Sequence, residues 1–112
     1  MSESTIHPVD GVLVVRAKGA VIAESRRAVA LHQDGQPPLH FVPREDVAMA
    51  FLERSPTAAS DTAMGETEYF NIVAKSGTVT DAAWSHPAPF PDLAAIAGFI
   101  AFDAEKAAVE LL

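Results

Sequence analysis

Short apolar runs separated by tight-turn signals constrain the fold of this chain most strongly. The first run, residues 12–17, is rich in β-branched side chains, and Lys18-Gly19 can turn the chain so that residues 20–23 return beside it. Comparable runs follow at residues 28–32, 39–42, 67–74, 78–83 and 99–102. This spacing is typical of antiparallel strands, so we predict an all-β domain of about eight or nine strands with one or two short helical turns.

The chain is long enough for one domain with its own core, at 112 residues. We predict a single domain over residues 11–112, preceded by a flexible, polar lead-in over residues 1–10. Residues 53–66 are small and polar, and a stretch of that kind predicts a functional or mobile loop, in which we expect residues 58–66 to be mobile without a ligand.

Two segments fit either a helix or a strand. Asp46 can cap a helical turn, but the residues that follow it also alternate as in a strand, and we favour a short helical turn leading into an irregular strand. Residues 103–112 favour a helix when taken alone, although a turn over residues 103–106 followed by a strand over residues 107–111 fits as well.

Composition excludes several classes of function. Fifteen acidic residues against eight basic ones give a net charge of -7, which repels phosphate backbones, so we expect no nucleic-acid partner. Cysteine is absent, which removes disulfides, thiol nucleophiles and cysteine metal sites. No apolar run approaches the roughly 20 residues that span a bilayer, and the first residues do not resemble a signal peptide. We therefore expect a cytoplasmic protein with no membrane partner and no cofactor.

Three charged residues follow Pro43, where a predicted strand must stop because proline cannot continue the hydrogen-bonded ladder. Arg44, Glu45 and Asp46 then lie at a strand exit, a common position for a site. One interpretation is an internal ion-pair network among the three; the other is a site in which Arg44 binds an anionic group and a carboxylate acts as acid or base. The preceding arginine pair, Arg26-Arg27, is expected at a solvated strand edge.

Further candidates lie around the single tryptophan. Trp84 is either a core anchor or the wall of a ligand pocket. The four histidines lack the spacing of a metal motif, so no metal site is predicted; they are His7, His32, His40 and His86. The catalytic candidates are Glu45, Asp46, Asp81 and His86, and the ligand-binding candidates are Arg44, Trp84, His86, Phe41 and Tyr69.

Four segments resemble a known family: Val-Ile-Ala-Glu-Ser-Arg-Arg-Ala at 21–28, Phe-Val-Pro-Arg-Glu-Asp-Val at 41–47, Asp-Ala-Ala-Trp-Ser-His-Pro-Ala-Pro at 81–89 and Ile-Ala-Gly-Phe-Ile-Ala-Phe at 96–102. In order and spacing they are similar to bacterial domain-of-unknown-function family 427, over roughly residues 11 to 111. The resemblance implies a small antiparallel β-tent, an architecture shared with methionine sulfoxide reductase B and the thalidomide-binding domain of cereblon. It also favours a strand at the C-terminus.

The chain departs from the family pattern in two places. The family usually carries a Cys-Pro-Tyr-Lys-Gly block where this chain has Asp61, Thr62, Ala63, Met64 and Gly65. The family's Trp-Ser-Tyr is Trp-Ser-His here, at residues 84–86. If the family's chemistry needs that cysteine or lysine, this chain lacks it, and the chain is then either a divergent binder or a protein whose site is rebuilt around Asp61 and His86.

Three functions remain as hypotheses. The leading one is a module that binds a small molecule or a partner segment at a rim formed by residues 43–46 and 84–86. The second, which follows the nucleotidyltransferase-like label that the family sometimes carries, is an enzyme acting on a phosphorylated metabolite, with Asp46, Asp61 or Asp81 holding a divalent ion. The third is a structural homo-oligomer that pairs through exposed strand edges.

Overall fold

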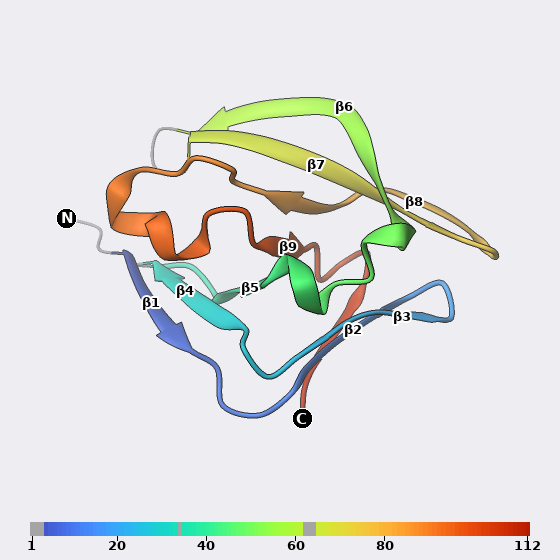
Figure 1. Cartoon of the computed structure of the whole chain (residues 1–112), viewed down its shortest axis with the longest axis horizontal. Helices are drawn as coiled ribbons and strands as arrows, with labels where there is room; N and C mark the ends of the chain where they lie inside the picture. Colours follow the sequence, from blue (N-terminus) through green and yellow to red (C-terminus); the bar gives the residue numbers. More distant parts are fainter. Residues whose placement is uncertain (1–3, 34, 62–64) are drawn as a thin grey trace.

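The protein forms two antiparallel β-sheets in a computed structural model that describes residues 4–33, 35–61 and 65–112 (Figure 1). The larger sheet has the strand order β1-β4-β5-β9-β8-β7-β6, and the smaller sheet has the order β10-β2-β3. The bounds of the ten strands in the described residues are β1 Ser4–Pro8, β2 Leu13–Ala17, β3 Ala20–Ser25, β4 Val29–Gln33, β5 Leu39–Val42, β6 Leu52–Asp61, β7 Gly65–Ala74, β8 Gly77–Ser85, β9 Ile100–Phe102 and β10 Ala108–Leu111. The all-β prediction is confirmed.

The helical content consists of short 3-10 segments. They are η1 Arg44–Asp46, η2 Met49–Phe51 and η3 Pro91–Ile96. The first two connect β5 to β6, in agreement with the predicted short helical turn that leads into an irregular strand. The third precedes β9 and packs Leu93 and Ile96 against one face of the larger sheet. Within the described residues, no helix is long and apolar enough to cross a membrane.

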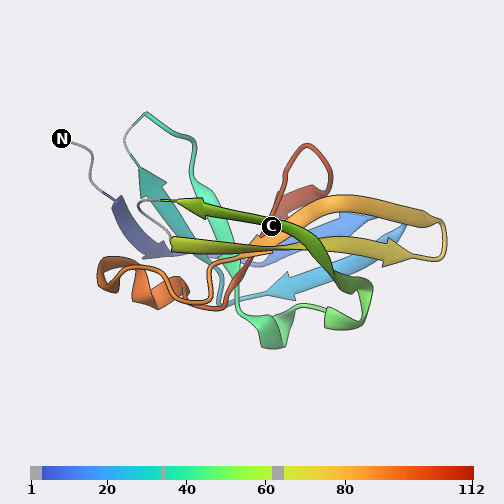
Figure 2. The ribbon, with the colours of Figure 1, turned by 90° about the horizontal axis from the view of Figure 1, so that it is seen from above.

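The main core lies between the two sheets. Buried side chains of β2 and β3 pack there against β5, β7, β8 and β9, and fully enclosed members include Val15, Ile22, Val42, Ile72 and Ile100. In Figure 1 the β2–β3 hairpin lies below the β7–β8 hairpin, and Figure 2 shows the two from above. Their tips are joined because the Ser76 hydroxyl donates to the Lys18 carbonyl at 2.8 Å. The two hairpins therefore enclose the core as two walls fixed at their ends.

The structure differs from the sequence-based expectation at both ends of the larger sheet. Within the predicted lead-in, β1 pairs with β4, and Ile6 lies opposite Leu31. The predicted loop over residues 53–66 is wrong over most of its length, because β6 pairs with β7 in a long hairpin. An edge strand needs little apolar surface, so its small polar residues resemble a loop in the sequence. The remainder of that predicted mobile segment, residues 62–64, lies outside the described residues.

The C-terminal segment forms a turn and a strand. The Asp103 carboxylate accepts the Glu105 backbone N–H at 2.9 Å, and the Asp103 carbonyl accepts that of Ala107 at the same distance. Strand β10 then pairs with β2, which places Val109 opposite Val15. The helix favoured by local propensity is therefore wrong, because pairing with β2 outweighs a preference worth tenths of a kcal/mol per residue, on the order of the helix propensity scale.

Candidate functional site

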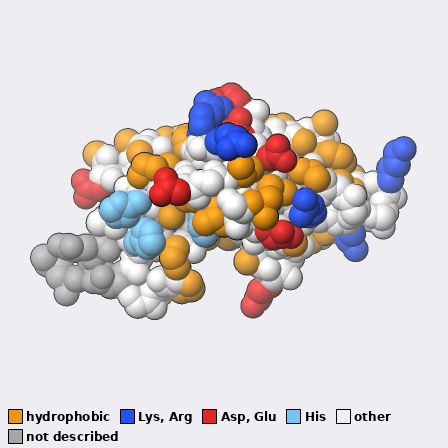
Figure 3. Space-filling view, turned by 90° about the horizontal axis from the view of Figure 1, so that it is seen from below, with side chains coloured by type: hydrophobic (Ala, Val, Ile, Leu, Met, Phe, Trp, Pro, Cys, Tyr) orange, Lys and Arg blue, Asp and Glu red, His pale blue; other side chains and the backbone are white. Residues whose placement is uncertain are grey.

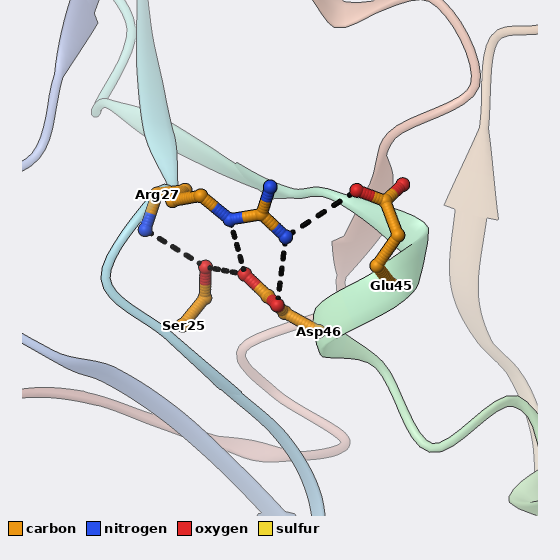
Figure 4. Close-up of polar contacts among 4 residues, drawn as sticks. All are labelled: Ser25, Arg27, Glu45 and Asp46. Atoms are coloured by element: carbon orange, nitrogen blue, oxygen red, sulfur yellow. Dashed lines mark hydrogen bonds and ion pairs between the residues drawn. The ribbon is translucent and has the colours of Figure 1, made fainter.

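The carboxylates at the strand exit pair with Arg27 (Figure 4). Its Nη2 donates to Oδ1 of Asp46 at 2.9 Å and lies 3.3 Å from Oε2 of Glu45. The buried Ser25 hydroxyl donates to Oδ2 of Asp46 at 2.6 Å and accepts the Arg27 backbone N–H at 3.0 Å. The hydrogen bonds from Arg27, and then the one from Ser25, lower the pKa of Asp46. An ion-pair network is thus present, but Arg27 supplies the cation that we expected from Arg44.

Arg44 instead joins the strand exit to β7 and to the segment between η3 and β9. Its Nε donates to the Gly98 carbonyl at 2.8 Å, and its Cζ lies 5.6 Å from the centre of the Phe70 ring. The Gly98 backbone N–H donates to the His86 carbonyl at 3.1 Å. The backbone N–H and carbonyl of Gly98 therefore connect Arg44 to the segment that follows Trp84, and the guanidinium has a packing and hydrogen-bonding role.

Four of the predicted ligand-binding residues gather on one face of the larger sheet. Tyr69 pairs with Trp84 across β7 and β8, and their ring centres are 6.5 Å apart. His86 lies two residues beyond Trp84 and shares its face, where its ring centre is 6.0 Å from that of Phe41. The buried Thr67 hydroxyl lies 3.2 Å from Nδ1 of His86. These side chains face η3, and Trp84 packs against its apolar cluster, as a core anchor would.

Arg44 does not share that face. Phe70 precedes Asn71 and follows Tyr69 on β7, and successive side chains of a strand point to opposite faces. Because the guanidinium of Arg44 stacks on Phe70, it lies on the face opposite Tyr69 and Trp84. The structure therefore brings Phe41, Tyr69, Trp84 and His86 together and places Arg44 apart from them.

The remaining catalytic candidate, Asp81, lies where β7 and β8 shift register. Its backbone has a positive φ of 51°, and its N–H donates to Oδ1 of Asn71 at 2.9 Å. The Thr57 hydroxyl donates to Oδ2 of Asp81 at 2.8 Å. The hydroxyls of Ser55 and Thr57 lower the pKa of the carboxyl. Asp81 thus connects the irregular stretches of β6, β7 and β8. Among the described residues it shares no hydrogen-bond partner with Asp46, so the two carboxylates belong to separate clusters.

A cavity of about 240 Å³ opens between the two sheets, at a place that the sequence did not indicate. We call it the inter-sheet cavity; its walls are Leu13, Val15, Pro38, Leu39, His40, Phe102, Ala104 and Val109. His40 is the one titratable side chain in this lining. Burial, and then the charge of His32, lowers the pKa of His40, so its imidazole is neutral at neutral pH. The cavity was not indicated by the sequence because its walls come from β2, β5, β9 and β10, whose packing no local pattern reveals.

Comparison with known proteins decides the family. The model of a family described as Domain of unknown function (DUF427) matches residues 5–111. The chain belongs to the DUF427 family. A comparison with curated proteins found no match.

The ends of β6 and β7 meet at the block where the resemblance implies a departure from the family. Asp61 ends β6 and pairs with Gly65, which begins β7, while residues 62–64 lie outside the described residues. A Cβ atom at Gly65 would lie 3.1 Å from the Ala88 carbonyl oxygen, and its φ is 73°. A larger residue at Gly65 would therefore meet both backbone strain and a neighbouring backbone.

Proposed function

We propose that this DUF427 protein is a binding module that takes a small, mainly apolar molecule into the inter-sheet cavity. The observation that carries the proposal is the lining: apolar side chains from both sheets surround one neutral imidazole, that of His40. Ligand sites usually combine an apolar wall with a few polar groups that fix orientation. A neutral imidazole can donate through one ring nitrogen and accept through the other, so it suits a ligand with one polar group.

The size of the cavity limits the ligand. An apolar cavity of about 150 Å³ in another protein holds a benzene molecule. At about 240 Å³, the inter-sheet cavity suits one ring with a small substituent rather than a nucleotide. The absence of a charged side chain from the cavity lining also favours an uncharged ligand, because a buried charge without a partner is unfavourable.

The contacts at the predicted rim favour the inter-sheet cavity, rather than the rim, as the ligand site. Trp84 packs against Tyr69 and the cluster under η3, and Arg44 lies on the opposite face with its Nε bonded to Gly98. The lowered pKa values of Asp46 and Asp81 also keep both carboxylates ionised at neutral pH. A general acid or base works best when its pKa lies near the working pH, so binding is favoured over acid–base catalysis.

A cavity-filling substitution tests the proposal. A panel of uncharged single-ring compounds, half of them with a hydroxyl or amide group, is screened for a rise in the melting temperature of the wild type. Ala104→Leu places a larger side chain in the cavity lining and should abolish the rise for each binder. Ala108→Leu is the matched control, because this exposed position next to Val109 lies outside the lining and should keep the rise.

A second substitution tests the polar contact. His40→Phe keeps a ring of similar shape but removes both ring nitrogens. Compounds with a hydroxyl or amide group should lose affinity in this variant, whereas purely apolar compounds should not. A wild type whose melting temperature no compound raises, or binding that survives in Ala104→Leu, would show that the inter-sheet cavity is not the ligand site.

A further inference from the structure

Three histidines lie around Ala30 on one face of β1, β4 and β5. Ala30 pairs with His7 on one side and with His40 on the other, and directly opposite residues of paired strands face the same way. His32 follows Ala30 by two positions on β4, so it shares this face as well. Histidine side chains gather at one end of the surface in Figure 3. The small side chain of Ala30 leaves room for the imidazoles that surround it.

Two of these imidazoles are in contact. The ring centres of His7 and His32 are 5.4 Å apart, with the planes inclined at 68°. Both residues are exposed, so an ion bound there can keep water as its remaining ligands. His7 and His40 are separated by two strand spacings, about 10 Å, which is too far for one ion to bind both directly.

We propose that His7 and His32 together form a surface site for a divalent transition-metal ion that prefers imidazole, such as Ni²⁺ or Zn²⁺. Imidazole nitrogen binds such ions at about 2.0–2.1 Å, and two neighbouring rings reach one ion by rotating about their side-chain bonds. No set of three His, Asp or Glu side chains in the described part of the chain is arranged to hold a metal ion, so the site has two protein ligands and water. It is a surface site and does not require the inter-sheet cavity to bind anything.

The surroundings of the pair support a cation. The chain carries a net charge of -7, so a bound divalent ion meets no general repulsion. Neutral imidazoles that bind the ion in place of protons leave the face with the two positive charges of the divalent ion.

Paramagnetic broadening by Ni²⁺ tests the site in the full, tag-free chain. Ni²⁺ added to the ¹⁵N-labelled protein should broaden amide signals of β1 and β4 around His7 and His32 first. His7→Ala and His32→Ala should each weaken binding at least about tenfold, since the loss of even an outer-shell partner weakens metal binding by that much. Binding should also weaken below about pH 6.5, where free imidazole is protonated.

Thr5→Ala is the matched control, because Thr5 lies opposite His32 on β1 and its removal leaves both histidines in place. It should bind Ni²⁺ as the wild type does. Melting curves without metal confirm that the histidine variants stay folded. Broadening centred on other residues, or broadening that is unchanged in both histidine variants, would overturn the site, as would loss of binding in Thr5→Ala equal to that in His7→Ala.

Discussion

Arg27 binds the carboxylate of Asp46 through two hydrogen bonds, from Nη2 to Oδ1 at 2.9 Å and from Nε to Oδ2 at 3.3 Å. The pair joins the link between β3 and β4 to η1, two segments that pack together beside the main core. Planar guanidinium and carboxylate groups match in this arrangement, and the Ser25 hydroxyl completes the contacts of Asp46. The segment that follows Pro43 is therefore fixed by Ser25 and Arg27, which lie about 20 residues earlier in the chain.

Acid should weaken the fold partly through Asp46. Its pKa is lower in the folded protein than its ordinary value of 3.8, so its stabilising contribution is present above about that pH and is lost as the pH falls through the folded value. Asp46→Asn should therefore lose stability at neutral pH, and the difference from the wild type should shrink below about pH 4. Urea unfolding of both proteins between about pH 2 and 7 measures the difference in their free energies of unfolding across the range in which Asp46 titrates.

Arg27→Ala serves as the companion variant, because it removes the partner and leaves the carboxylate. Its stability deficit should shrink over the same acidic range, and adding Asp46→Asn to it should have little further effect. A deficit of Asp46→Asn that stays constant with pH, or full additivity of the two changes, would contradict the assigned contact.

Arg44 should stabilise the fold. Arg44→Ala removes the hydrogen bond to the Gly98 carbonyl and the contact with the Phe70 ring, and should lower the free energy of unfolding by about 1–3 kcal/mol. Arg44→Lys should recover only part of this, because an ammonium group lacks the planar fork. Arg26→Ala is the control at an exposed arginine and should stay within about 0.5 kcal/mol. If chemical denaturation gives Arg44→Ala and Arg26→Ala the same free energy of unfolding, Arg44 does not stabilise the fold through these contacts.

Gly11 should resist substitution more than Gly19. Both have a positive φ, of 99° and 77°, so alanine is strained at either position by about 1–2 kcal/mol. A Cβ atom at Gly11 would also lie 2.3 Å from the Leu112 carbonyl oxygen, whereas nothing lies within 4 Å of one at Gly19. Gly11→Ala should therefore melt well below Gly19→Ala. Equal melting temperatures would mean that the contact with Leu112 does not form in solution.

The sequence predicted those elements whose pattern is local. The hairpin around Lys18-Gly19 and the strand over residues 39–42 follow from turn residues and short apolar runs, and both are present. Strand β6 was missed because its Ser, Thr and Ala residues lie at a sheet edge, where pairing with β7 rather than burial stabilises them. β10 depended on the distant strand β2, which no local pattern reveals.

The candidate site shows the same division. Pro43 correctly marked the end of β5, and an ion-pair network does follow it. Its cation is nevertheless Arg27, which the sequence placed at a solvated edge, because only the fold brings residues 27 and 46 together. The inter-sheet cavity was not predicted for a similar reason: its walls come from β2, β5, β9 and β10, and their meeting depends on how the two sheets pack.

Methyl and indole NMR signals, followed while single-ring compounds are added to the wild type, test the central claim most directly. Val15 and Val109 line the inter-sheet cavity, and the single indole of Trp84 reports on the predicted rim. Binding in the inter-sheet cavity should shift the methyl signals of Val15 and Val109 and leave the Trp84 indole signal in place. A shift of the Trp84 signal with unchanged Val15 and Val109 signals would contradict the account and place the ligand at the rim.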